Sequence, residues 1–374
     1  MSSVTGSGRG VLPYQALEKL VSTGVIRARN PILPEQIQPS SIDLRLGHEA
    51  YRVRASFLAA GSATVTSKLE QYRMHTIDLT RPAVLEKGCV YIVPLQEELS
   101  LPADISGKAN PKSSTGRLDI FTRLITDEGR QFEIVPSGYK GRLYAEVVPR
   151  TFSVVVRQGE RLSQLRLFQG EYRPSDQLLR NLESVEALVF HPDESRAEAE
   201  IHNGLRLSVD LEGIDGSSVI GYRARRNAPL VDLARIQYYN PAEFWEPIYR
   251  NETKTLILDT EDFYILASRE KVRIPAMYAA EMVPYDPTIG EFRIHYAGFF
   301  DPGFGYGSAG EISGTRAVLE VRSHEVPFIM EDGQVVASLV FEELLERPRV
   351  LYGEGIGSSY QRQGLKLSKH FKTT

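Results

Sequence analysis

The chain has a single cysteine, Cys89, among its 374 residues. One cysteine cannot form an intrachain disulfide, so the sequence indicates a reducing compartment. It also excludes any zinc site that needs a Cys-x-x-Cys pair. The seven histidines are scattered, and no two of them have the i, i+4 spacing of a helical metal pair. We therefore expect no zinc site in this protein.

Long apolar runs and an excess of basic residues are also missing. No segment approaches 18 consecutive apolar residues, so no membrane span is expected. The first ten residues are small and polar and lack the apolar stretch of a signal peptide, so we expect a flexible tail over residues 1–12 and a cytoplasmic location. A formal net charge of −4 and a pI near 6.1 argue against a dedicated nucleic-acid binder.

Short strands separated by turns dominate what is present. Apolar positions at helical spacing predict one helix from Tyr14 to just before Gly24 and a second over 175–187. Elsewhere, runs rich in Val, Ile, Tyr and Phe alternate with turn residues, and the chain holds 30 Gly and 21 Pro. This pattern is typical of an antiparallel β-sandwich or barrel. The clearest predicted strands are Val90–Val93, Leu143–Val148, Phe152–Val156, Leu256–Leu258 and Ala317–Val321.

An internal repeat divides the chain. A shift of 173 residues places Tyr91–Pro94 on Tyr264–Ala267 and Glu97 on Glu270, and a shift of 174 places Glu146 on Glu320. Matches that run without a gap indicate duplication of one β-unit. The predicted organisation is a first copy over 13–175, a helical segment and linker over 176–200, and a second copy over 201–374.

One motif of the first copy suits a phosphate group. Residues Lys112 to Arg117 read Lys-Ser-Ser-Thr-Gly-Arg. Two adjacent hydroxyls donate hydrogen bonds, the flanking cations supply charge, and Gly116 lets the backbone approach closely. A basic, hydroxyl-rich turn alone is most often only a solvated loop, so this motif needs support from elsewhere in the chain.

The second copy lacks this motif and carries a different one. Tyr285-Asp286-Pro287 stands where Lys112-Ser113-Ser114 would fall, and an aspartate there would repel a triphosphate. Instead the second copy has Phe300-Asp301-Pro302-Gly303-Phe304, followed by Ala317-Val318-Leu319-Glu320. The best match in the first copy, Val135–Tyr139, has no carboxylate. The two copies have lost complementary parts, which predicts one composite site between them.

These segments resemble the signature motifs of a known family. Pro39-Ser-Ser-Ile-Asp-Leu-Arg-Leu-Gly47, Lys112–Arg117, the Asp301 hairpin with Glu320, and Ser358–Gly364 are similar, in that order, to segments of the deoxycytidine triphosphate deaminases in double-length form. The resemblance implies a mainly β fold with two tandem copies of the distorted β-barrel of the deoxyuridine triphosphatase superfamily and a few short helices. Such barrels assemble as trimers, and it stays open whether the sites here lie within one chain or between chains of a homo-oligomer.

The resemblance also assigns roles to particular residues. Glu320 would be the catalytic carboxylate. The remaining substrate contacts would be Lys112, Ser113, Ser114 and Arg117 on the triphosphate, Ala297 and Val318 on the base through their backbones, Asp301 on the deoxyribose hydroxyl, and Tyr352 and Gln363 closing over the nucleotide from the tail. The chain departs from the family at Ser359, where a lysine is usual, and at Phe299, where a cation is frequent. The missing phosphate charge would then come from Arg362 or Lys366.

The implied reaction is hydrolytic deamination of deoxycytidine triphosphate to deoxyuridine triphosphate and ammonia. One glutamate can accept a proton from water and then donate it to the leaving group. Partial burial at the end of an apolar strand would raise the pKa of Glu320. Without the neighbouring motifs, Glu320 would be interpreted as an ordinary strand-end glutamate, and Glu146 is interpreted as a structural leftover. Mg²⁺ is expected to arrive on the triphosphate and not in a protein cage.

Other functions remain open at this stage. A deoxyuridine triphosphatase, or an enzyme with both activities, would share the fold, although the glycine-rich tail of those hydrolases is reduced here to Gly364. A non-catalytic nucleotide-binding barrel is a further alternative. Arg223-Ala-Arg-Arg226 is interpreted as a solvated face, not as a nucleic-acid contact, and the only tryptophan, Trp245, as a packing residue.

Overall fold

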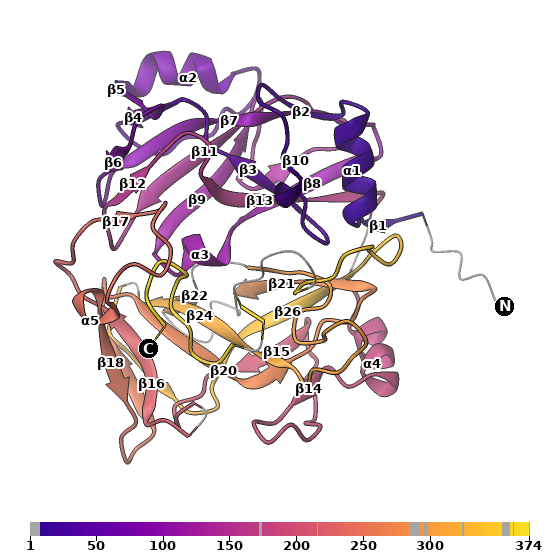
Figure 1. Ribbon diagram of the computed structural model, residues 1–374, viewed down its shortest axis with the longest axis vertical. Coiled ribbons are helices and arrows are strands. Elements are labelled where there is room, and N and C mark those ends of the chain that lie inside the picture. Colours follow the sequence, from indigo (N-terminus) through magenta and orange to yellow (C-terminus); the bar gives the residue numbers. More distant parts are fainter. Residues whose placement is uncertain are drawn as a thin grey trace. The chain divides into compact units, whose positions relative to one another are not determined.

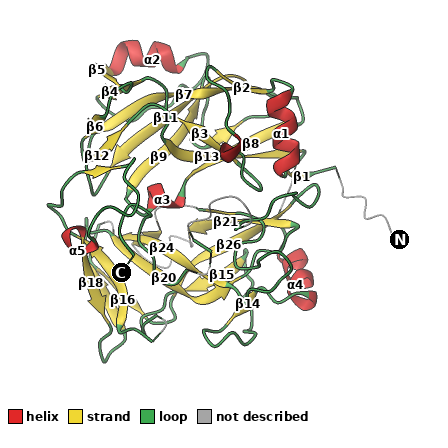
Figure 2. Ribbon diagram, in the orientation of Figure 1, coloured by secondary structure: helices red, strands yellow, loops and turns green. Residues whose placement is uncertain are grey.

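The computed structural model describes residues 8–171, 174–214, 216–284, 292–294, 298–323, 325–353, 360–361 and 363–373. Strands greatly outnumber helices, and the helices are short (Figure 2). The chain forms two compact units. Unit 1 contains the described residues up to 171 together with Pro229–Ile236 and Leu344–Arg349, and unit 2 contains the rest (Figure 1).

Unit 1 consists of three sheets. The largest has the order β5-β4-β7-β11-β9, with β2 also paired to β7; the second has the order β1-β13-β8-β10, with β3 paired to β13; the third is β17-β12-β6. The strands are β1 (Gly10–Val11), β2 (Ile26–Ala28), β3 (Ile42–Arg45), β4 (Glu49–Val53), β5 (Arg73–Asp78), β6 (Ala83–Leu85), β7 (Val90–Ser100), β8 (Ile105–Pro111), β9 (Ile120–Thr126), β10 (Ile134–Val135), β11 (Lys140–Pro149), β12 (Val154–Val156), β13 (Arg161–Gln169) and β17 (Val231–Asp232). Its helices are α1 (Tyr14–Ser22), a 3₁₀ turn (Pro34–Gln36), α2 (Val65–Tyr72) and α3 (Ser113–Gly116).

Unit 2 repeats this arrangement. Its sheets are β18-β16-β20-β24-β22 with β14 paired to β20, β15-β26-β21-β23, and the pair β19-β25. The strands are β14 (Val189–Phe190), β15 (Leu205–Ser208), β16 (Val219–Ala224), β18 (Trp245–Tyr249), β19 (Thr255–Leu258), β20 (Tyr264–Val272), β21 (Tyr278–Pro284), β22 (Phe292–Ile294), β23 (Phe299–Phe300), β24 (Thr315–Ser323), β25 (Phe328–Glu331) and β26 (Val335–Glu343), and the helices are α4 (Asp176–Val185) and α5 (Pro241–Phe244).

The strand registers agree with the internal repeat seen in the sequence. Glu146 on β11 lies opposite Ile92 on β7, and Glu320 on β24 lies opposite Ile265 on β20. Small details recur as well. The Tyr91 hydroxyl accepts a hydrogen bond of 3.0 Å from the Glu86 amide, and the Tyr264 hydroxyl accepts one of 2.9 Å from the Asp259 amide. These equivalent strands of the two units therefore share the same pairing.

The core of unit 2 sorts the residues of β24 onto two faces. Successive strand residues point to opposite sides of a sheet. Ala317, Leu319 and Val321 belong to the buried apolar cluster of the unit. Val318 and Glu320 therefore point to the other face, together with their cross-strand neighbours on β20.

Both predicted helices are observed, as α1 and α4, but two predicted boundaries differ. The flexible tail expected over 1–12 is wrong at its end, because Gly10 and Val11 form β1 against Phe168 and Gln169 of β13. The stretch 176–200, expected as a linker, belongs to unit 2. Leu179 and Leu188 pack into its core, and Arg196 forms an ion pair of 2.8 Å with Glu183. Burying these apolar side chains removes the freedom that a linker would have.

A glutamate ties the strands together in each copy, fully buried as Glu97 in the first and half-buried as Glu270 in the second, and its partner differs. Glu97 accepts hydrogen bonds of 2.8 Å from both the backbone amide and the Nε of Arg45. Glu270, its repeat-mate, accepts 2.9 Å and 2.6 Å bonds from the amide and hydroxyl of Ser208. Burial raises the pKa of Glu270, and its bonds to Ser208 counteract that only in part. The first copy thus balances this buried charge with an arginine, and the second with a neutral donor.

Removing the arginine should cost far more stability than removing the serine hydroxyl. We expect Arg45→Met to lower the free energy of unfolding by about 3–5 kcal/mol, because it leaves a buried carboxylate without its cation. Ser208→Ala, the matched change in the second copy, should cost only about 1 kcal/mol. Urea unfolding of both variants measures the difference, and equal losses would contradict this interpretation of the pair.

Glu270 should also make stability depend on pH. Its pKa is higher in the folded chain than its ordinary value of 4.5. The stabilisation by its protonated form is therefore complete below that value and is lost as the pH rises through the raised folded-state pKa. Glu270→Gln should unfold at a higher temperature than the native protein near pH 7, and the gain should vanish towards about pH 4. A variant less stable than the native protein at pH 7 would show that the ionised carboxylate is the form needed.

Candidate active site

The phosphate-binding motif of the first copy forms a tight turn between two strands. It begins where β8 ends at Pro111 and includes α3, which β9 follows. The amides of Thr115 and Gly116 donate to the Lys112 carbonyl at 2.8 Å and 3.0 Å, which fixes the turn. Ser113 is half-buried, whereas Ser114 and Arg117 are buried. The motif is thus a fixed part of unit 1 and not the solvated loop that its composition alone suggests.

A buried carboxylate holds the lysine of this motif. The Lys112 ammonium forms an ion pair with Asp43 on β3, and Arg161 at the start of β13 lies 3.8 Å from the same oxygen of Asp43. Asp43 is almost fully buried, and its second oxygen has no hydrogen-bond partner among the described residues. Two cations, Lys112 and Arg161, thus flank one buried carboxylate.

The sequence analysis assigned no role to Asp43 and did not identify Arg161. Asp43 lies inside the Pro39–Gly47 segment, whose other residues are also buried and structural: Arg45 binds Glu97, and Ser40 accepts a 3.2 Å hydrogen bond from Arg166. Nothing in the local sequence marks Arg161, because the pairing of β3 with β13 brings it beside Asp43. Only the strand order reveals this neighbour.

The hairpin of the second copy lies between β23 and β24. Asp301 is buried directly after β23, and Phe300 pairs with Ala280 of β21. Gly303 has a φ of 96°, which favours glycine, and a Cβ at this position would come within 2.9 Å of the Tyr352 amide. In the first copy Val135 pairs with Gly107, the repeat-mate of Ala280, so Pro136 occupies the place of Asp301. The carboxylate is therefore absent from the first copy, as the sequence predicts.

The C-terminal tail is fastened to this hairpin. The Tyr352 amide donates to the Pro302 carbonyl at 2.8 Å, and the ring of Tyr352 lies 5.6 Å from that of Phe304. The Gln361 side chain donates to the Gly303 carbonyl and accepts from the Gly305 amide, both at 3.0 Å. Tyr352, expected to close over a nucleotide, is thus placed on the hairpin that holds Asp301. The sequence did not single out Gln361.

The proposed catalytic carboxylate lies on β24. Glu320 and Val318 are both buried, and they share the face of the sheet opposite the apolar core. Gln363 of the tail reaches the start of the same strand, where its amide donates to the Arg316 carbonyl at 3.1 Å. Within unit 2, the structure therefore associates Gln363 with the strand of Glu320, and Tyr352 with the hairpin of Asp301.

A polar cavity of about 210 Å³ opens where Gln363 meets β24. Two of its lining residues, Gln363 and Thr315, each have a buried side-chain oxygen without a hydrogen-bond partner among the described residues. An unsatisfied buried polar atom costs about 1–3 kcal/mol, so such atoms indicate a place for a ligand or water. Lys271 and two glutamates complete the polar rim.

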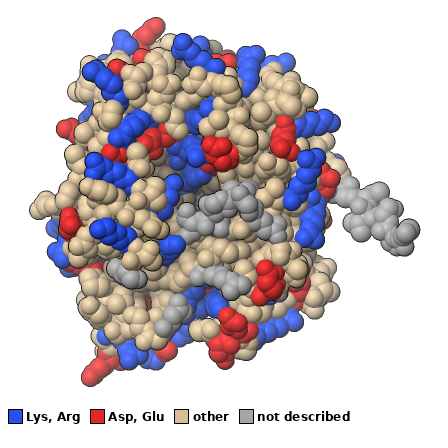
Figure 3. Space-filling view, viewed as in Figure 1, with Lys and Arg blue, Asp and Glu red and all other residues tan. Residues whose placement is uncertain are grey.

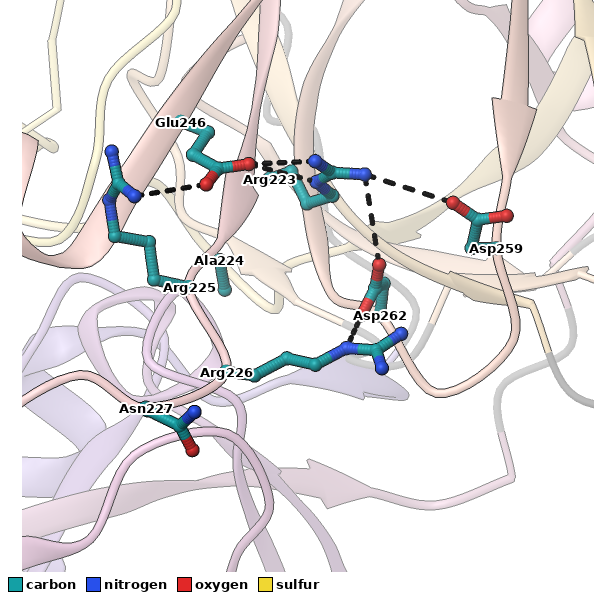
Figure 4. A pocket seen from close by; sticks show the side chains of 8 residues that line it. All are labelled: Arg223, Ala224, Arg225, Arg226, Asn227, Glu246, Asp259 and Asp262. Atoms are coloured by element: carbon teal, nitrogen blue, oxygen red, sulfur yellow. Dashed lines mark hydrogen bonds and ion pairs between the residues drawn. The ribbon is translucent and has the colours of Figure 1, made fainter.

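A larger cavity of about 490 Å³ lies over the arginine cluster of β16 and the residues after it (Figure 4). Arg223 and Arg225 donate to Glu246 at 2.7 Å and 3.0 Å, and Arg226 donates to Asp262 at 2.9 Å. These carboxylates neutralise the cluster, which favours the interpretation of a solvated ionic face. Acidic and basic side chains are also interspersed over the face in Figure 3.

Several predicted features have a simple outcome. In the part of the chain that the structure describes, no three His, Cys, Asp or Glu side chains gather as metal ligands, and no helix is long and apolar enough to cross a bilayer. Trp245 is buried among aromatic rings, with Phe371 at 5.9 Å and Phe263 at 6.0 Å. Ala297, Ser359 and Arg362 lie outside the described residues.

Known proteins share both halves of this architecture. The sequence model of the 2'-deoxycytidine 5'-triphosphate deaminase N-terminal domain matches residues 8–171, and that of the C-terminal domain matches residues 175–371. A crystal structure of 2'-deoxycytidine 5'-triphosphate deaminase from Agrobacterium tumefaciens is 48% identical, with a TM-score of 0.85 over 91% of this chain and 100% of that one.

Shorter relatives match part of the chain. A dCTP deaminase from Natronomonas pharaonis is 27% identical over 132 residues, which are 35% of this chain and 65% of the relative. A dUMP-forming dCTP deaminase from Methanosphaera stadtmanae is 27% identical over 169 residues, which are 44% of this chain and 82% of the relative. Since the two family domains together cover nearly the whole sequence, this chain belongs to the 2'-deoxycytidine 5'-triphosphate deaminase family.

Proposed function

We propose that this enzyme deaminates deoxycytidine triphosphate hydrolytically, at a site to which both copies contribute. The observation that carries the proposal is the complementary loss at equivalent positions. The phosphate-binding motif is kept only in the first copy, and the Asp301 hairpin only in the second, where Pro136 is the counterpart. Random loss from two equivalent sites would not leave one complete set of parts.

Glu320 is the group that moves protons in this proposal. Water adds to the ring carbon that bears the amino group, and the carboxylate accepts the proton of that water. The same proton then goes to the departing nitrogen, which leaves as ammonia, while the ring keeps the water oxygen as a carbonyl and the second water proton ends on the adjacent ring nitrogen. The buried position of Glu320 beside Val318 limits competing solvent and keeps the carboxylate fixed. No zinc is assigned, because the chain has one cysteine and no Cys-x-x-Cys pair.

The triphosphate is assigned to Lys112, Ser113, Ser114 and Arg117, with Arg161 as an additional source of charge beside Asp43. Mg²⁺ would arrive bound to the phosphates, in keeping with its preference for few protein ligands and retained water. Asp301 would hold the sugar hydroxyl, Ala297 and Val318 would meet the base through their backbones, and Tyr352 and Gln363 would cover the nucleotide. The unpartnered Oε1 of Gln363 supports its role, because it is a buried acceptor free to bind a ligand donor.

The repeated strand registers also support two tandem barrels of the deoxyuridine triphosphatase type. The homo-oligomer rests on the family resemblance, in which such barrels assemble with one another. A second candidate activity is the release of pyrophosphate after deamination. Two relatives that match this chain are named dUMP-forming dCTP deaminases, and these names favour testing for both products. A binder without catalysis would release neither.

Glu320→Gln should abolish ammonia release while sparing nucleotide binding. Losing the proton-transfer group should lower kcat by about 10²–10⁴-fold, because a glutamine cannot accept the proton of water. Ammonia and pyrophosphate measured in one incubation with deoxycytidine triphosphate separate a deaminase from an enzyme with both activities. A native protein that releases no ammonia, or a Glu320→Gln variant with unchanged kcat, would refute the proposed reaction.

Arg117→Met and Lys112→Met should both weaken substrate binding. A charge-assisted hydrogen bond from either cation to phosphate is worth roughly 1.5–3 kcal/mol, or about tenfold or more in KM. Arg225→Met in the ionic cluster is the matched control and should leave KM unchanged. Steady-state kinetics, with melting temperatures to confirm folding, make the comparison. An increase in KM for the control alone would move the phosphate site to the cluster.

A further inference from the structure

The first copy keeps a carboxylate at the position of Glu320. Glu146 and Glu320 occupy equivalent places on β11 and β24, each opposite the equivalent isoleucine of the neighbouring strand. Glu146 is fully buried. Alternation along β11 puts Glu146 on the same face as Tyr144, and the register puts Ile92 of β7 beside it. This is the face that carries Glu320 in the second copy.

An arginine of the same sheet is hydrogen-bonded to this carboxylate. Arg123 on β9 lies directly opposite Glu146. Its Nε and Nη2 donate to one oxygen of Glu146 at 3.0 Å and 2.6 Å, and Nη2 also donates to the Ser56 hydroxyl at 3.0 Å. The guanidinium lies over the ring of Phe132, 3.5 Å from its centroid, and 4.6 Å from that of Phe121. A planar N–C–N group is thus bound by a buried carboxylate and aromatic rings.

An inserted segment covers the same face of the sheet. Residues 54–72 connect β4 to β5 and include α2, which lies beside these strands in Figure 1. Val65 and Leu69 of α2 pack with Ile92 and Tyr144 in one apolar cluster. The Val65 amide also donates to Asp127 at 2.7 Å. Burial of this apolar surface keeps the segment in place.

The second copy has no helix like α2 at the equivalent place. Between β16 and β18, where every residue is described, its chain has β17 and α5 instead. The carboxylate of the first copy is therefore covered by a segment that the second copy does not share.

We propose that Arg123 is a built-in ligand that permanently fills the first copy's remnant of the catalytic position, so that each chain has one working site. The ring atoms around the amino-bearing carbon of cytosine form a planar N–C–N group of the same kind. The guanidinium of Arg123 stands in for such a group against Glu146. The inference has two parts. The claim of one working site for each chain rests on the proposed function of Glu320. The claim that Arg123 fills a pocket for a planar amidinium does not depend on it.

The number of working sites is tested by substituting each carboxylate. Glu146→Gln should keep ammonia release within about twofold of the native rate, whereas Glu320→Gln should lose it. If Glu146→Gln does not fold, Arg123→Leu/Glu146→Leu replaces the pair by apolar side chains of similar bulk and serves instead. If Glu146→Gln or the double variant folds but no longer releases ammonia, the inference is wrong. If Glu320→Gln instead releases ammonia at the native rate, that result would count against the proposed function and not against this inference.

Arg123→Ala tests the pocket itself, with methylguanidinium as the probe. The variant should melt below the native protein, and millimolar methylguanidinium should raise its melting temperature by about 2–4 °C, since a ligand that binds only the folded state stabilises it. The native protein, whose pocket is filled, and Arg123→Ala/Glu146→Gln, which lacks the carboxylate, are the controls and should not respond. If Arg123→Ala folds only with the probe present, that supports the pocket. No response of Arg123→Ala, or an equal response of the controls, would overturn it.

Calorimetric titration of Glu320→Gln with deoxycytidine triphosphate gives the stoichiometry. One nucleotide for each chain is expected, because the remnant is filled. Two nucleotides for each chain would overturn the inference without affecting the reaction assigned to the second copy.

Discussion

The register of one antiparallel strand pair determines on which face of its sheet Glu320 lies. Glu320 can face away from the core only because β24 pairs with β20 so that Leu319 and Val321 enter the core. A slip of one residue would exchange the faces and bury the carboxylate among apolar side chains. The same register recurs between β7 and β11 of the first copy, so Glu146 lies on the equivalent face of its sheet. The carboxylate position is thus a property of the β-unit and not of the motif around it.

The two copies have used this shared position differently. In the second copy the tail contacts the strand of Glu320 through Gln363 and is fastened to the Asp301 hairpin through Gln361. In the first copy Arg123 and the segment that contains α2 cover the equivalent position. The first copy has instead kept the Lys112–Arg117 turn, in which Asp43 forms an ion pair with Lys112. The proposed function assigns the phosphates to the first copy and the base and sugar to the second.

Much of the fold could be predicted from the sequence because its signals are local or repeated. The helical spacing from Tyr14 onward and the matched prolines and tyrosines of the two copies needed no knowledge of strand order. The boundaries were less secure. Gly10 and Val11 join a sheet through backbone hydrogen bonds to β13, and an apolar pattern does not record such bonds. The stretch 176–200 is polar enough to suggest a linker, yet Leu179 and Leu188 anchor it in a core.

The site was harder to predict where it depends on neighbours distant in sequence. Motifs identified Lys112, Arg117 and Glu320, but they could not show that Asp43 holds Lys112 or that Arg161 stands beside both. The partner of Glu146 was equally hidden, since Arg123 has no motif of its own and reaches the carboxylate only through the pairing of β9 with β11. Strand pairing, which the sequence does not specify residue by residue, decides these contacts.

The most direct test of the shared site is a crystal structure of Glu320→Gln with deoxycytidine triphosphate and Mg²⁺. The account predicts a single nucleotide whose phosphates contact Ser114 and Arg117 of a first copy while its base lies against Val318 and residue 320 of a second copy, in the same chain or in a neighbouring one. Phosphates bound away from the Lys112–Arg117 turn, or a base bound far from β24, would contradict it.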